Sequence, residues 1–70
     1  MENLKFTVRM IAAFLDMSVA QLARTACIDE QHLRGVARGD VKMTGEDLLK
    51  LAAVSGIPTD RIFFGDDING

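Results

Sequence analysis

The residues that could do chemistry gather in residues 29–38, where an expected helix carries polar side chains on its outer face. They are Glu30, Gln31, Arg34 and Arg38, with Gly35 among them. Glutamine can pair with adenine, arginine with guanine O6 and N7, and glutamate can accept a hydrogen bond from cytosine N4. A glycine inside a helix costs about 1 kcal/mol against alanine, so Gly35 indicates the close approach of another group. This combination is typical of a helix that reads base edges.

A second interpretation of the same residues needs no ligand. Glu30 and Arg34 are four positions apart, the spacing at which opposite charges pair on an exposed helix. His32 is expected at the exposed flank of this helix, either as a phosphate or base contact or as a surface histidine without a role. Both interpretations stay open on the residues alone.

Five helices are expected to position this stretch, over residues 7–16, 18–26, 29–38, 44–55 and 59–64. Each begins at a residue that can cap a helix N-terminus, namely Thr7, Ser18, Asp29, Thr44 and Thr59. Ser18 and Gln21 have the spacing of a capping box. Gly39 and Gly56 stand where two of the helices should end. We therefore expect a compact all-α domain with short loops.

The second and third expected helices have the spacing of a helix-turn-helix. The first helix of this motif needs a small residue in its middle, because the second helix crosses it closely, and Ala23 stands there. Ile28, Leu33 and Val36 supply the apolar residues that face back. The turn at residues 26–28 has the length for a crossing of roughly 100–120°.

Length and composition exclude several classes of protein. Seventy residues form one domain, residues 1–70, with a small core, since such a chain buries only about 60% of its unfolded surface. One cysteine, Cys27, allows no internal disulfide, and with one histidine it makes no metal set. No run approaches the roughly 18 apolar residues of a membrane span. With no signal peptide either, we expect a cytoplasmic protein without a membrane partner.

No arrangement of residues indicates catalysis. The chain shows no pair of carboxylates placed for acid–base work, no nucleophile with a plausible base and no glycine-rich phosphate loop. We therefore expect neither an enzyme nor a cofactor.

The charge of the chain is uneven. The net charge is −2, which by itself does not indicate a nucleic-acid partner. Residues 1–17 balance to zero, residues 18–42 carry an excess of +1, and residues 43–70 carry −3. The only positive segment is the one that contains the polar helix.

The first expected helix is apolar on nearly two faces. One stripe begins at Val8 and follows the i, i+3, i+4, i+7 rule. Met10, Phe14 and Met17 form a second stripe, which a helix at the outside of a small domain does not need. Either this stripe lies under the C-terminal tail, or it contacts a second copy of the chain. The candidates for a homodimer contact are Met10, Phe14, Phe63, Phe64 and Ile68.

Two motifs have a spacing found in one family of proteins. They are S-x-x-x-L-A-x-x-x-x-I-D-x-x-x-L-x-x-V-x-x-G over residues 18–39 and LLKLAAVSGIPTDRIFFG over residues 48–65. Together they resemble the lambda-repressor/Cro-like DNA-binding domains, over about residues 8–64. The resemblance implies a five-helix domain whose helix 29–38 enters the major groove of double-stranded DNA, commonly as a homodimer on a palindromic operator.

The resemblance also implies roles for individual residues. Base contacts would come from Glu30, Gln31, Arg34 and Gly35, and phosphate contacts from Ser18, Val19, Arg38 and Lys42. Three positions differ from the usual pattern: Val19 replaces a glutamine, Cys27 replaces a glycine in the turn, and Ala12 replaces an arginine.

These observations lead to two hypotheses. The first is a sequence-specific transcription regulator that resembles stand-alone phage or prophage Cro-type proteins, because the chain ends at Gly70. The second is a protein-interaction module on the same fold, such as an antitoxin-like or anti-repressor partner, with weak or no DNA binding. The acidic C-terminal part and the second apolar stripe favour the second hypothesis.

Overall fold

Regular structure in residues 5–63, the part of the chain that this computed structural model describes, consists of four α-helices and one turn of 3-10 helix. In chain order these are α1 (Val8–Phe14), α2 (Val19–Ala26), α3 (Glu30–Arg38), α4 (Gly45–Ser55) and η1 (Thr59–Arg61). The all-α prediction is confirmed. The helices α2, α3 and α4 match their predicted ranges to within one residue.

The prediction of a fifth helix over residues 59–64 is wrong, since η1 is a single turn that ends at Arg61. Ile62 is extended, with φ −104° and ψ 131°, and forms an isolated parallel bridge with Phe6. The Phe63 N–H donates to the Phe6 carbonyl at 2.8 Å, and the Phe6 N–H donates to the Arg61 carbonyl at 2.7 Å. The backbone of Phe6 therefore bonds to the Arg61 carbonyl and the Phe63 N–H, which a longer helix would use for its own hydrogen bonds. Residue 64 lies outside the described residues.

The predicted N-terminal caps of the α-helices are confirmed. The Ser18 hydroxyl accepts from the Gln21 N–H at 3.1 Å, and the Gln21 side chain accepts from the Ser18 N–H at 2.9 Å. The Asp29 carboxylate accepts from the His32 N–H at 3.0 Å and so caps α3. These bonds satisfy N–H groups that have no partner within their own helix. The starts of α2 and α3 are therefore fixed by local contacts.

Left-handed residues end the helices and set the turns. Gly39 and Gly56 adopt this conformation after α3 and α4, as predicted. Cys27 also adopts it, with φ 60°, at the position where the resembling family has glycine. Its carbonyl accepts from Lys50 Nζ at 2.9 Å, which ties the turn to α4. The helix α1 ends at Phe14, two residues earlier than predicted, and Asp16 just after it is left-handed, with φ 60°.

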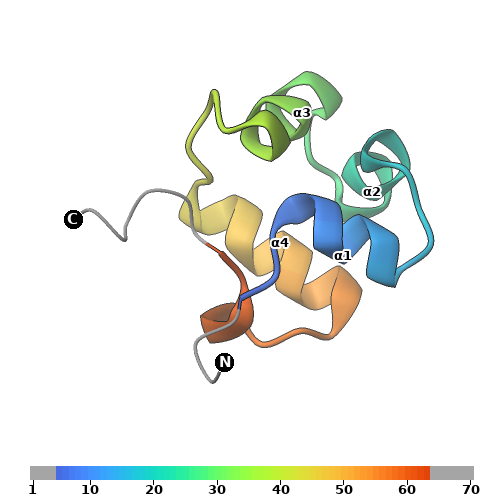
Figure 1. Cartoon of the computed structure of the whole chain (residues 1–70), viewed down its shortest axis with the longest axis vertical. Coiled ribbons are helices and arrows are strands. Elements are labelled where there is room, and N and C mark those ends of the chain that lie inside the picture. The colour runs from blue at the N-terminus through green and yellow to red at the C-terminus, as the bar shows by residue number, and fades with distance from the viewer. Residues whose placement is uncertain (1–4, 64–70) are drawn as a thin grey trace.

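One hydrophobic core joins the four helices. Its completely buried residues are Ile11, Leu22, Ala23, Leu33 and Leu51. Of the apolar residues predicted to face inward from the second and third helices, Ala23, Ile28 and Leu33 are buried, and Val36 is half-buried. Figure 1 shows α2 and α3 together at one end of the domain and η1 at the opposite end. The outer side of α3 consequently has no other element of the described chain in front of it.

The second apolar stripe of α1 is only partly covered. The exposed fraction is 61% for Phe14 and 38% for Met10, while Met17 is half-buried. Phe6 packs edge-on against Phe14, with ring centroids 6.2 Å apart. Of the tail residues named as candidates for a homodimer contact, Phe63 is half-buried, whereas Phe64 and Ile68 lie outside the described residues.

Candidate nucleic-acid interface

The outer side of α3 carries the polar side chains that the sequence places there. Gln31, Arg34 and Arg38 are exposed, and Glu30 is half-buried. Leu33, in the same helix, is completely buried and holds α3 against the core. The exposed row Gln31, Arg34 and Arg38 therefore lies on a helix whose opposite side is packed in the core.

The charged residues of this row form ion pairs. Arg34 approaches Glu30 to 2.7 Å, one turn away on the same helix, as the interpretation without a ligand predicts. Arg24 of α2 approaches the other oxygen of Glu30 at 3.6 Å. Arg38 donates to Asp40 at 2.9 Å. More than half of each side chain of Arg34 and Arg38 remains exposed, so water screens these pairs and they contribute little to stability.

The expectation that Gly35 lies on the exposed, base-facing side is wrong, because Gly35 is buried. A Cβ at this position would lie 2.7 Å from Cγ2 of Val41 and 3.3 Å from its Cβ. The chain after α3 folds back here, and the N–H groups of Asp40 and Val41 donate to the Gly35 carbonyl at 2.9 and 3.3 Å. Glycine is thus needed for the packing of a loop rather than for the approach of a ligand.

The expectation that His32 lies exposed at the flank of α3 is also wrong. His32 is half-buried, and its Nε2 lies 2.6 Å from Oδ2 of Asp47 on α4. The same carboxylate oxygen accepts from the Thr44 N–H at 3.0 Å and caps α4. The ring of His32 therefore connects α3 to the start of α4 and is engaged inside the fold.

Asp47 is the one buried charged residue that the core of residues 5–63 contains. Burial by itself raises the pKa of Asp47. The hydrogen bonds from the Thr44 backbone and from His32 outweigh burial and hold this pKa below its ordinary value. The local sequence pattern does not indicate the contact of Asp47 with His32, because the two residues are fifteen positions apart.

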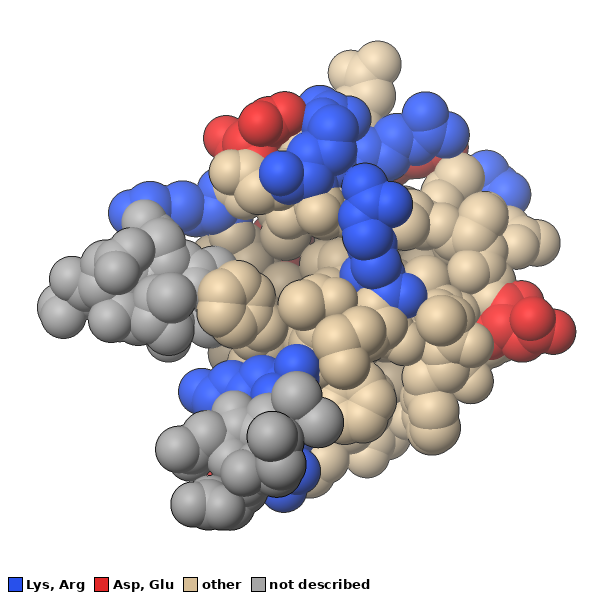
Figure 2. Space-filling model, in the orientation of Figure 1, with Lys and Arg blue, Asp and Glu red and all other residues tan. Residues whose placement is uncertain are grey.

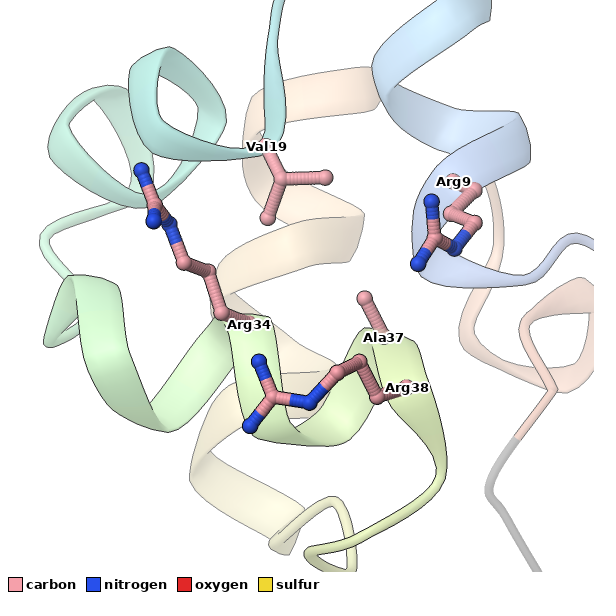
Figure 3. Close-up of a pocket in the computed structure, with 5 residues that line it drawn as sticks. All are labelled: Arg9, Val19, Arg34, Ala37 and Arg38. Carbon is pink, nitrogen blue, oxygen red and sulfur yellow. The ribbon is translucent and has the colours of Figure 1, made fainter.

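A hollow of about 200 Å³ opens beside the exposed row and is lined by Arg9, Val19, Arg34, Ala37 and Arg38. Figure 3 shows Val19 and Ala37 between the three arginine side chains, which come from α1 and α3. Val19, predicted as a phosphate contact, is half-buried at the start of α2 and forms part of this lining. The structure therefore brings together Val19, Arg34 and Arg38 from the predicted set.

Positive side chains gather at the end of the domain that carries α3. In Figure 2, Lys and Arg side chains spread across this end, with Asp and Glu side chains beside them. Ser18 and Lys42, the remaining predicted phosphate contacts, are both exposed. Alternating charges limit the positive potential of this face to a modest value.

Sequence reasoning missed Arg9 as a member of this group. The apolar stripes of the first helix indicate which of its residues are buried, and they do not indicate a role for Arg9. The available signal was its place next to Val8, whose burial turns the neighbouring Arg9 outward.

Comparison of the chain with protein-family models, with curated proteins and with solved structures gave no match. Within residues 5–63, no helix is long and apolar enough to cross a membrane. The same part of the chain contains no group of three or more His, Cys, Asp or Glu side chains that could hold a metal ion.

Proposed function

We propose that this protein is a sequence-specific DNA-binding transcription regulator of the lambda-repressor/Cro type, with α3 as the helix that enters the major groove. The observation that carries the proposal is the exposed row Gln31, Arg34 and Arg38 on a helix at the edge of the domain. Its support from α2 has the helix-turn-helix order and spacing.

The shape of the domain around α3 supports this proposal. The major groove of B-DNA is about 12 Å wide and admits an α-helix. The described chain leaves the outer side of α3 open, while Leu33 and the bond between His32 and Asp47 fix its inner side. A helix held in this way keeps its polar side chains in a constant register against a ligand.

Gln31 and Arg34 supply the chemistry for base contacts. An exposed glutamine can form two hydrogen bonds with adenine, and an arginine can form two with guanine. The pair with Glu30 orients the guanidinium of Arg34 along the outer side of α3. Glu30 itself is left in the proposal as a group that orients arginine and can accept from cytosine N4. His32 and Gly35 are not part of the proposed surface.

Phosphate contacts would flank the base contacts. Arg38 and Lys42 are exposed cations near the end of α3, and Ser18 and Val19 begin α2. The first N–H groups of a helix have no partner within it and can donate to a phosphate oxygen. The backbone of Val19 can therefore replace part of what a glutamine side chain would supply.

The protein would bind as a homodimer on a palindromic operator. A domain of this size gains stability and DNA affinity from a second copy, and the exposed Met10 and Phe14 offer an apolar contact. The two copies of α3 would then be about 34 Å apart, one turn of DNA.

The experiment is selection of duplexes from a random pool, followed by titration of the selected duplex at fixed salt. Gln31→Ala and Arg34→Ala should each weaken binding by about 1–3 kcal/mol and relax the preference at one base position. Arg61→Ala on η1 is the control, because it removes one exposed charge at the opposite end of the domain. If no duplex is enriched, or if all three variants bind as the parent does, the proposal is wrong.

A protein-interaction module on the same fold, antitoxin-like or anti-repressor, is the second candidate function. The 61% exposure of Phe14 favours it, since an aromatic side chain this open is common at protein interfaces. Such a module would show no binding to random duplex at low salt, whereas a DNA-binding protein would show binding that falls steeply with salt.

A further inference from the structure

The hollow beside α3 combines cations from two helices with an apolar lining. Arg9 comes from α1, Arg34 and Arg38 come from α3, and Val19 and Ala37 lie between them (Figure 3). A site with guanidinium groups around a small apolar surface fits an anion that carries a hydrocarbon portion.

The charge of this hollow depends on Arg9. Arg34 is paired at 2.7 Å with Glu30, which Arg24 outside the hollow also approaches at 3.6 Å. Arg38 is paired with Asp40 at 2.9 Å. For Arg9, the described part of the chain provides neither an ion pair nor a hydrogen bond to its guanidinium. The three arginines that line the hollow face two carboxylates, an excess of +1, and Arg9 is the arginine that pairs with neither of them.

We infer that the hollow holds one phosphodiester group of the DNA backbone and that Arg9 of α1 is the residue whose charge attracts it. The inference rests on the proposed function and extends the DNA contact from α2 and α3 to α1. The planar guanidinium of Arg9 can donate two parallel hydrogen bonds to phosphate oxygens without giving up another partner.

Val19 then contributes through contact rather than through a hydrogen bond. A phosphodiester brings the carbons of deoxyribose with it, and Val19 and Ala37 present the apolar surface on which these carbons can lie. Such contact excludes water from the hollow and strengthens the ionic bond of Arg9 to the phosphate. A free phosphate ion would gain nothing from this apolar surface.

The test measures binding to a random-sequence duplex and to the selected duplex as a function of salt, for the parent chain, Arg9→Ala, Arg9→Lys and Arg61→Ala. Each phosphate neutralised contributes about 0.9 to the slope of log affinity against log salt. Arg9→Ala should reduce this slope by about 1 and leave the preference for the selected duplex unchanged. Arg9→Lys should keep the slope, and Arg61→Ala should behave as the parent. Thermal unfolding of each variant checks that the exposed substitution leaves the fold intact.

The outcomes separate this inference from the proposed function. If the parent binds with a salt-dependent affinity and Arg9→Ala keeps the full slope, the hollow holds no phosphodiester while the proposed function stands. If the parent does not bind duplex DNA at low salt, the proposed function itself fails. A change of base preference in Arg9→Ala would contradict a phosphate contact. Binding of inorganic pyrophosphate alone, as tight as that of the duplex, would assign the hollow to a free anion and overturn the inference.

Discussion

The two sides of α3 are held by different kinds of contact. On the inner side, Leu33 is completely buried, Gly35 meets Val41 closely, and His32 lies 2.6 Å from Asp47. On the outer side, Arg34 and Arg38 make ion pairs that stay more than half exposed. Each inner contact has one geometry, whereas an exposed ion pair can exchange its partner for another anion at little cost. One nine-residue helix thus separates residues that fix its position from residues free to bind.

The largest expected effect comes from Leu33→Ala, compared with Gln31→Ala two positions away. Leu33 has no exposed surface, so its truncation should lower the free energy of unfolding by about 2–5 kcal/mol. Gln31 is exposed, and its truncation should change that free energy by less than about 0.5 kcal/mol. Chemical denaturation followed by helical circular dichroism measures both. Equal losses in the two variants would break the distinction between the sides.

Gly35→Ala should reverse its sign with the residue at position 41. In the parent, the added methyl would lie 2.7 Å from Val41 Cγ2, and overpacking of this kind costs about 1–3 kcal/mol. Alanine also favours the helix by about 1 kcal/mol, so the net result is a modest loss. In a Val41→Gly background both close contacts, to Cγ2 and to Cβ, disappear, and the same substitution should stabilise.

The four denaturation midpoints of this cycle test the packing of the loop on α3. A Gly35→Ala substitution that stabilises both backgrounds equally would mean that Val41 does not press on the helix.

The contact between His32 and Asp47 should make stability depend on acid. The folded pKa of Asp47 lies below its ordinary value of 3.8, so its contribution is fully present only above about pH 5. That contribution is lost as the pH falls through the lower folded value, because the carboxylate is then protonated in both states. The free energy of unfolding should therefore fall less steeply below pH 4 in Asp47→Asn than in the parent.

His32→Ala completes this comparison at neutral pH. Loss of the ring leaves the Asp47 carboxylate with one hydrogen bond fewer and should lower the free energy of unfolding by about 1–2 kcal/mol. An unchanged acid profile in Asp47→Asn, or no loss in His32→Ala, would place the link between α3 and α4 elsewhere.

Local chemistry explains what the sequence predicts well. Ser18 with Gln21, and Asp29 with the N–H three residues later, form caps within one turn, so their residue types suffice to place α2 and α3. The spacing of Ala23, Ile28 and Leu33 likewise predicts which side of α2 and α3 is buried. The family resemblance implies a glycine where Cys27 stands, and Cys27 adopts the left-handed conformation that glycine favours.

Contacts between distant residues explain what the sequence does not predict. The loop after α3 returns over Gly35, and nothing in the local pattern indicates that Val41 would cover it. Asp47 of α4 contacts His32 of α3. Phe6 forms a parallel bridge with Ile62, and the last helix is limited to one turn. Arg9 joins Arg38 at the hollow only because α1 crosses beside α3 in space. The local sequence pattern therefore predicts the helices of the candidate site, whereas tertiary packing decides which side chains meet there.

The central claim, that the outer side of α3 meets duplex DNA, is tested most directly by mapping amide and arginine side-chain signals of the isotope-labelled chain by NMR during titration with a selected duplex. The account predicts that the largest shifts fall on Gln31, Arg34 and Arg38 and on the first residues of α2, with small shifts at Arg61. Shifts confined to Met10 and Phe14, or no shifts at low salt, would contradict it.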